Sequence, residues 1–365
     1  MSFWPEGDRE FQEALRVLKD NTLSLDNAEV FPTSSLDVLG ETGVLGWSIP
    51  REYGGSEFSG TDLVEGYLQL ARACLPTTFV LTQRNAACQR FALSENEPLK
   101  AELLPQLVGS ARFVTVGISH LTTSRQHLTQ PAVRVKLAAG RIQLDGVVPW
   151  VTGAGQADWV LTGGTCEDGR QVLVVLPMDS GGITVLPAQD LLALDSSQTA
   201  SIQLENVSID DSMLVAGPVD GVMQSGGRGG TGSLGTSALA LGAASASLER
   251  LAEEASNRPE LDEVLGPLTA EWEQVVGDVL AASGESADSQ APELTNESLR
   301  QRSNSLVLRA AQAHLAASKG AGFTASHPAS RSVRESMFFL VWSCPQAVVA
   351  ANLREFAGLL DGPVC

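Results

Sequence analysis

The side chains that most often carry chemistry are few in this sequence and widely spaced. The histidines form neither an HExxH nor an HxH pattern, so no metal site is expected among them: His120, His127, His314 and His327. The 5 cysteines contain no CxxC pair, which excludes a zinc ribbon and is typical of a chain in a reducing compartment. The sequence therefore predicts a cytoplasmic protein without a metal centre.

A glycine-rich segment, SGGRGGTGS over residues 225–233, precedes a helical pattern and contains Arg228. Backbone amides in such a segment can hold a phosphate or CoA group at the start of a helix. The segment lacks the G-K-[ST] of a Walker A motif, and no strand–helix crossover surrounds it. A flexible linker between domains has the same composition. Both interpretations stay open at this level.

Composition and charge narrow the class of protein. The chain has 365 residues, of which 43% are hydrophobic, and a net charge of −19. A nucleic-acid partner is not expected, because phosphate binding needs clustered lysine and arginine. No apolar run approaches the roughly 18 residues that cross a bilayer, and the amino terminus lacks the features of a signal peptide. We therefore expect neither a membrane span nor secretion.

The spacing of apolar residues divides the chain into three predicted domains. Residues 1–112 show helical spacing, as in Phe11, Leu15 and Leu18. Residues 113–216 contain short β-branched segments separated by Gly, Asp and Pro, with a hairpin turn at 139–140. Residues 217–365 return to helical patterns. Helices, strands and helices in this order predict an α+β chain with segregated elements.

Four local sequences resemble segments of the acyl-CoA dehydrogenase family. GVLGWSIPREYGG (43–55) is similar to the P-x-E-Y-G-G segment, and DGVVPWVTGAGQADWVLTGG (145–164) to the W-I-T strand pair. Residues 201–217 resemble the family's exit from its middle domain, and 319–336 its late G-G-x-G segment. The resemblance implies a helical N-terminal domain, a β-barrel or sandwich middle domain and a C-terminal four-helix-bundle domain.

The same resemblance implies FAD as the cofactor, because in this family FAD lies extended between the β domain and the C-terminal domain. The middle-domain residues that contact it match Ser119, Trp150 and Thr152. An aromatic ring offers a flat wall to a flavin, and hydroxyls can hydrogen-bond its edge and tune its electronics. The alternative is that Trp150 is a core residue and Thr152 only ends a strand.

The diphosphate end of the cofactor site matches the family less well. The family's arginine falls on Asp262, whose carboxylate would repel a diphosphate. Arg258 is near enough in sequence to replace the lost charge. The family's glutamine falls on Ala316, and the glycine pair that follows falls on Lys319 and Gly320. Lys319 either holds a phosphate or is a solvated surface charge.

The family dehydrogenates acyl-CoA thioesters, and a carboxylate removes the α-proton while the flavin accepts hydride. A carboxylate suits this step because desolvation raises its pKa toward neutrality. Its usual position falls on Ser343, and its alternative position on Gly235, with Thr236 in place of a substrate-orienting arginine. His120, beside Ser119, is the other candidate base, since a neutral imidazole accepts a proton. A partly buried polar contact is the structural alternative for His120.

Three functions are compatible with these residues. The first is an FAD-binding oxidoreductase that acts on an acyl thioester with a non-standard base. The second is a catalytically inactive paralogue or partner subunit of a heteromeric dehydrogenase. The third is a flavin-dependent monooxygenase of the same fold, which needs no α-proton base. The resemblance also implies a homodimer or homotetramer, and the second function implies a hetero-oligomer.

Overall fold

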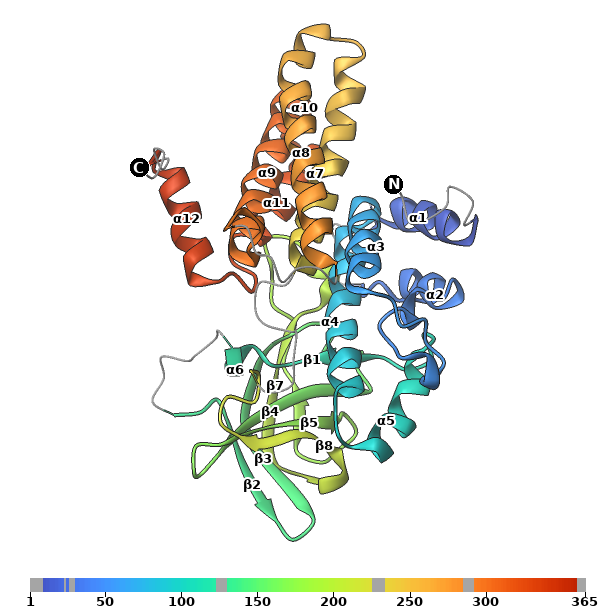
Figure 1. Ribbon diagram of the computed structural model, residues 1–365, viewed down its shortest axis with the longest axis vertical. Helices are drawn as coiled ribbons and strands as arrows, with labels where there is room; N and C mark the ends of the chain where they lie inside the picture. Colours follow the sequence, from blue (N-terminus) through green and yellow to red (C-terminus); the bar gives the residue numbers. More distant parts are fainter. Residues whose placement is uncertain are drawn as a thin grey trace. The chain divides into compact units, whose positions relative to one another are not determined.

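The computed structural model describes residues 9–22, 24–25, 30–122, 130–224, 234–284 and 292–359 (Figure 1). The glycine-rich segment 225–233 lies outside the described residues. The predicted order of helices, strands and helices is confirmed. The chain divides into two compact units. One contains Ser59–Thr78 and the described residues after 230, and the other contains Arg9–Phe58 with the described residues from 79 to 230.

The first unit is helical and is built around three long helices, α7 (Leu234–Ala255), α8 (Asp262–Ser283) and α9 (Asn296–Ala317). α3 (Gly60–Ala73) packs along α7, and α11 (Pro328–Phe338) lies on α9. α3 begins at a capping box, in which the Ser59 hydroxyl accepts from the Asp62 amide and the Asp62 carboxylate accepts from the Ser59 amide. α10 (Lys319–Gly322) precedes α11, and α12 (Gln346–Phe356) follows it.

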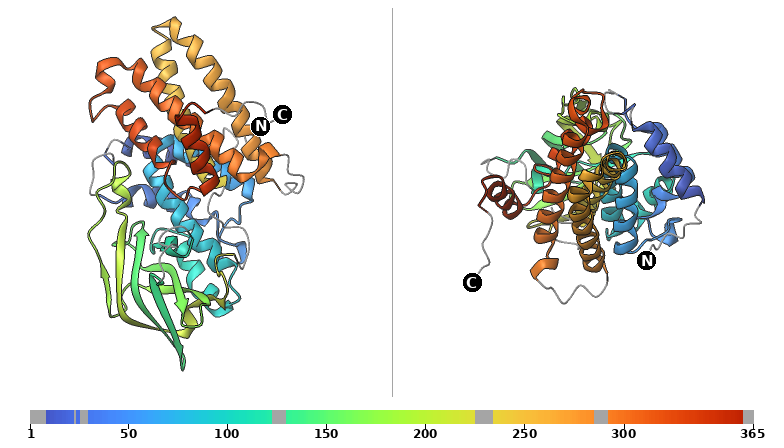
Figure 2. Two further views of the ribbon diagram at one scale, coloured as in Figure 1. Left: turned by 90° about the vertical axis from the view of Figure 1, so that its left-hand side faces the viewer. Right: turned by 90° about the horizontal axis from the view of Figure 1, so that it is seen from above.

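The second unit contains an eight-stranded sheet (Figure 2). Its strands follow the order β6-β7-β3-β2-β4-β5-β8, and β1 pairs with β4. The strands are β1 (Val114–Val116), β2 (Val133–Ala138), β3 (Arg141–Val151), β4 (Trp159–Cys166), β5 (Gln171–Pro177), β6 (Ile183–Val185), β7 (Ala200–Asp210) and β8 (Leu214–Val219). The predicted hairpin turn is confirmed, because Ala138 pairs with Arg141 and the two residues between them have φ of 42° and 80°. Two pairings are parallel, β1 with β4 and β2 with β4, within a sheet that is otherwise antiparallel as predicted.

Successive apolar side chains along the central strands point to opposite faces of the sheet and form two hydrophobic clusters. Leu161 of β4 and Leu173 of β5 pack with Phe91 of α4 (Leu75–Ala92). Val160 and Val172, one residue earlier on the same strands, belong to a second cluster made mostly of strand residues. The other helices of this unit are α1 (Arg9–Asn21), α2 (Thr33–Glu41), α5 (Glu97–Leu103) and α6 (Ser119–Thr122). Because side chains along a strand alternate between the two faces of the sheet, one face packs against helices and the other packs mainly against strands.

The predicted domain boundary at 112/113 lies just before β1, whereas the one at 216/217 falls inside β8. The compact units follow packing instead, because α3 joins the carboxyl-terminal helices while α1, α2 and α5 join the sheet. Short 3-10 turns connect these elements, at Val44–Gly46, Arg51–Tyr53, Leu104–Leu107, Asp195–Ser197, Asp211–Met213, Pro259–Leu261 and Pro292–Leu294. In the ranges that the structure describes, no helix is both long and apolar enough to cross a membrane.

Candidate functional site

Trp150 lies at an irregularity near the end of β3. From Val148 to Val151, β3 advances three residues while the paired strand β7 advances only two, from Ile202 to Ala200. The extra residue on β3 makes a β-bulge, a feature that re-aims side chains. The bulge breaks the alternation of the strand, so that Val148 and Val151 are buried whereas the Trp150 side chain is 44% exposed.

The backbone at this bulge is strained and supported from a neighbouring element. Trp150 has a φ of +57°, in the left-handed region that a bulky side chain rarely occupies. The Ser119 hydroxyl, at the start of α6, donates to the carbonyl oxygen of Pro149 at 3.1 Å. The structure thus brings Ser119 and Trp150 together. An exposed indole held in a strained backbone is a flat surface on which a planar ligand can stack.

Thr152 is placed differently from the other two predicted flavin contacts. Its side chain is 1% exposed, and its hydroxyl shares a hydrogen bond with the hydroxyl of Thr199 at 3.3 Å. A cofactor could reach this buried hydroxyl only if the residues around it moved. Thr152 lies directly after the last residue of β3, and its side chain is buried inside the β unit.

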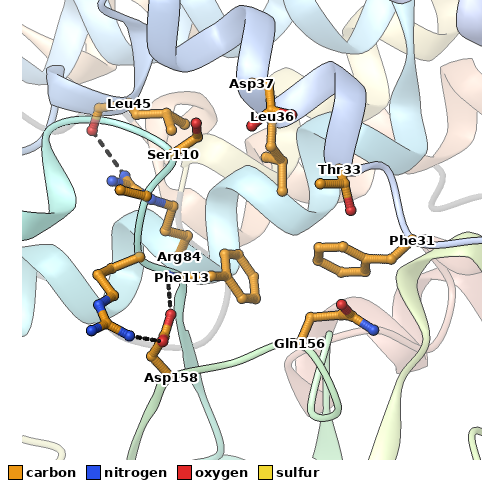
Figure 3. A pocket seen from close by; sticks show the side chains of 12 residues that line it. Phe31, Thr33, Leu36, Asp37, Leu45, Arg84, Ser110, Phe113, Gln156 and Asp158 are labelled. Atoms are coloured by element: carbon orange, nitrogen blue, oxygen red, sulfur yellow. Dashed lines mark hydrogen bonds and ion pairs between the residues drawn. The ribbon is translucent and has the colours of Figure 1, made fainter.

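A pocket of about 180 Å³ lies beyond this segment (Figure 3). Phe31 and Phe113 form an edge-to-face pair in it, with 5.3 Å between ring centroids, and Arg112 pairs with Asp158 at 2.6 Å. Pockets for drug-sized ligands measure about 300–1,000 Å³, so this one is too small for a dinucleotide. A Cβ on Gly153 would lie 2.7 Å from Phe31 and 2.9 Å from Phe113. The aromatic pair therefore supports the backbone just beyond the bulge.

His120 makes a buried polar contact. Its side chain is 9% exposed, and Nε2 donates to the carbonyl oxygen of Gly163 at 3.0 Å. A ring nitrogen that donates to a carbonyl carries a proton and cannot accept another one there. This contact is the structural alternative to the predicted role of His120 as a base.

Two predicted diphosphate contacts meet at the carboxyl end of α9 in the helical unit. Arg258 donates to Glu254 at 2.5 Å and to the carbonyl oxygen of Ala317 at 2.6 Å, just before Lys319. Lys319 is exposed with a φ of +53°, and a side chain on Gly320 would meet nothing within 4 Å. Open backbone beside two cations is a setting that a phosphate group can approach.

Asp262, which the resemblance aligns with the family's arginine, lies in the first turn of α8. An acidic side chain there interacts favourably with the positive end of the helix dipole. Asp262 therefore stabilises its own helix, and this accounts for a carboxylate at the position.

His314, on α9, is a buried titratable group near these cations. Its side chain is 2% exposed, and its ring centroid lies 6.4 Å from that of His327. Burial, followed by the charges of Arg250 and His327, lowers the pKa of His314 from 6.5 to about 4, and Glu254 acts in the opposite direction. The imidazole is therefore neutral at neutral pH.

We expect His314 to contribute acid sensitivity to folding. Its folded pKa is about 4 and its unfolded value 6.5, so the unfolded state binds more protons between these limits. Above pH 6.5 this difference contributes about 3 kcal/mol to the free energy of unfolding. The contribution is lost as the pH falls toward 4. Urea unfolding across this range should show a shallower pH dependence for His314→Gln than for the parent. Gln312→His, at an exposed position of α9, is the control and should match the parent; equal slopes for His314→Gln and the parent would contradict the expectation.

Ser343 lies in the turn between α11 and α12, with a φ of +42°. Three acids on α7, α11 and α12 have partners of their own. Glu249 pairs with Arg72, Glu335 lies 3.8 Å from Arg331, and Glu355 accepts from the Ser305 hydroxyl at 2.5 Å. Within the described ranges, no three His, Cys, Asp or Glu side chains are grouped closely enough to hold a metal ion.

Comparison with known proteins agrees with this architecture. A profile of the acyl-CoA dehydrogenase N-terminal domain matches residues 6–110. The probable acyl-CoA dehydrogenase YngJ of Bacillus subtilis (strain 168) is 25% identical over 260 residues, which cover 67% of this chain and 66% of that protein. The chain thus matches just under two thirds of that relative's length.

Solved structures share the fold over almost the whole chain. A glutaryl-CoA dehydrogenase from Mycobacterium smegmatis in complex with FADH2 superposes with a TM-score of 0.80 at 18% identity, covering 97% of this chain and 95% of that one. Nitrososynthase from Micromonospora carbonacea var. africana superposes with a TM-score of 0.78 at 18% identity, with the same coverage. The arrangement of helices, β-sheet and helices is that of acyl-CoA dehydrogenase-like proteins. Residues 6–110 thus match the N-terminal domain of acyl-CoA dehydrogenases, and the chain is similar to members of that family over about two thirds of its length.

Proposed function

We propose that the chain is an FAD-binding oxidoreductase that acts on an acyl thioester. The observation that carries this proposal is the Trp150 bulge, where an exposed indole is held at a φ of +57° and its neighbouring carbonyl is bound by Ser119. Packing alone does not explain a strained, exposed tryptophan, whereas stacking on a flavin does. Bound FAD would supply hydride acceptance.

Each compact unit, taken by itself, has residues that suit one part of FAD. Trp150 would form a wall for the ring system. Arg258 and Lys319 would hold the diphosphate, since opposite charges 4 Å apart attract by about 4 kcal/mol at an effective dielectric of 20. Arg258 is already directed to this end of α9 by its bond to the Ala317 carbonyl. The chain's own part in the reaction is therefore to bind, orient and exclude water.

The residues of this chain fit the role of proton acceptor in the proposed reaction less well. A serine hydroxyl at position 343 is not a base at neutral pH without a neighbour that removes its proton. The engagement of Glu249, Glu335 and Glu355 favours a second candidate function, a flavin-binding protein whose reaction needs no α-proton base or a subunit that is itself inactive.

We also propose that the chain self-associates as a homodimer or homotetramer through its carboxyl-terminal helices. Five large apolar side chains there are more than half exposed: Phe323, Val341, Leu353, Phe356 and Leu359. Burial of these side chains between copies of the chain would remove apolar surface from water. A single-chain mass in sedimentation at micromolar concentration would contradict this proposal.

The test is the visible absorption spectrum of the protein purified without added cofactor, followed by anaerobic titration with acyl-CoAs. We expect flavin bands that bleach slowly with a thioester. Ser343→Glu should speed bleaching at least tenfold, because a positioned general base contributes about 10²–10⁴ in rate. The matched control is Ser343→Gln, which adds the same bulk without a base.

The other outcomes separate the candidates. Flavin that does not bleach in the parent or in Ser343→Glu would favour the second candidate function. A protein that takes up no flavin on reconstitution would overturn the proposal.

A further inference from the structure

Arg300, on α9, is a fully buried cation whose hydrogen bonds converge on one turn. Its side chain is 0% exposed. Nη2 donates to the carbonyl oxygens of Phe339 and Trp342 at 3.2 and 3.0 Å, and Nε donates to Asn304 Oδ1 at 2.9 Å. We call residues 339–344, which follow α11 and carry Ser343, the Ser343 turn.

The charge of Arg300 is compensated in an unusual way. Buried charges normally pair with an opposite charge, but no ion pair links Arg300 to a carboxylate among the residues described. Its acceptors are carbonyls just beyond the last residue of α11, where the helix dipole concentrates partial negative charge. Burial lowers the pKa of Arg300 to about 10, so the guanidinium is still charged at neutral pH.

The Ser343 turn is tied to α9 at several points. Trp342, whose carbonyl accepts from Arg300, directly precedes Ser343. Asn304 also donates to the Phe339 carbonyl at 3.0 Å, and the Cys344 side chain is 9% exposed. Ser343 itself has a φ of +42°. A left-handed non-glycine residue costs about 1–3 kcal/mol and persists only where its surroundings determine it.

We propose that Arg300 is a positioning residue that fastens the Ser343 turn to α9 and holds Ser343 in its left-handed conformation. The inference rests on the proposed function, because Ser343 occupies the position of the family's base. The planar fork of arginine reaches two carbonyls and an amide oxygen at once, which the point charge of lysine does not. A lysine at position 300 would keep the charge but not the fork, and we therefore expect it to hold the turn only in part.

Hydrogen–deuterium exchange of the full chain tests the fastening. Arg300→Met should speed amide exchange over residues 339–344 at least tenfold, Arg300→Lys should give an intermediate rate, and exchange in α7 should stay unchanged. Arg302→Met is the matched control, since Arg302 is on the same helix and pairs with Asp278 at 2.6 Å, and it should leave the turn unchanged. If Arg300→Met does not fold, Asn304→Ala replaces it, with a smaller increase expected. Exchange in the turn equal to that of the parent, or raised equally by Arg302→Met, would overturn the proposal.

The rate of bleaching in the flavin-loaded protein is a second readout, which would not change if the role of Arg300 were only structural. Arg300→Lys should lower the rate of thioester-induced bleaching per bound flavin about tenfold at saturating thioester, with the half-saturating concentration changed less than twofold. Equal rates in Arg300→Lys and the parent, together with faster exchange, would overturn the positioning role. If the parent does not bleach, the proposed function fails, and the exchange comparison then decides the role of Arg300 by itself.

Discussion

Gly242→Val is expected to destabilise the helical unit by about 3 kcal/mol or more. A Cβ at position 242 would lie 2.4 Å from the carbonyl oxygen of Leu68, 2.8 Å from the Ala71 Cβ and 2.9 Å from the Arg72 amide nitrogen. Two of these atoms belong to the α3 backbone, which cannot rotate away as a side chain does. α3 and α7 would have to separate along their contact, and the apolar surface buried between them would be lost.

The measurement is urea unfolding followed by helical circular dichroism. Gly277→Val, in the interior of α8, is the matched control because a Cβ there would meet nothing within 4 Å. The same chemical change should be neutral or slightly stabilising at that site, since glycine is the poorer helix former by a few tenths of a kcal/mol. Equal losses at both positions would show that helix propensity, and not the close approach of α3, decides the effect.

The close contact at Gly242 illustrates what sequence patterns do and do not reveal about this fold. Period and turn chemistry are local, so the strands, the hairpin at 139–140 and the long helices α7, α8 and α9 were predictable. The partner of α3 is not a local property, because its apolar stripe is compatible with any helix or sheet. The parallel pairing of β4 with β1 and β2 is likewise set by the packed sheet. The start of α11 does carry a local signal, because Pro328 is its first residue.

The candidate site was likewise predictable from the sequence only in part. Motif resemblance selected Trp150 and Ser119, but the bulge that exposes Trp150 depends on the register between β3 and β7. Thr152 belongs to the same motif and yet is buried. Arg300 gave no signal, since a lone arginine in a polar helical segment reads as a solvated charge. Only the packing of α9 against the end of α11 converts it into a buried one.

Trp150→Gly is expected to weaken FAD binding about tenfold to a hundredfold while leaving folding stability nearly unchanged. Stacking and burial of an aromatic surface contribute about 1.5–3 kcal/mol to binding, which corresponds to that range. The Trp150 side chain is 44% exposed, so little folded-state packing is lost. Glycine also removes the strain of a φ of +57°, which offsets its greater freedom in the unfolded chain.

Folding stability and FAD affinity together distinguish a Trp150 that forms a wall for the flavin from a Trp150 that belongs to the core. Removing a core tryptophan costs about 3–5 kcal/mol of folding free energy, whereas we expect a change within about 1 kcal/mol here. Trp150→Phe keeps a flat ring and should retain most of the FAD affinity, measured by flavin fluorescence after reconstitution. A large loss of stability in Trp150→Gly, with FAD affinity unchanged per folded molecule, would assign Trp150 to packing. The bulge at Pro149–Trp150 would then need another explanation, because a strained backbone that presents an aromatic ring to solvent is a net cost to folding unless a ligand uses it.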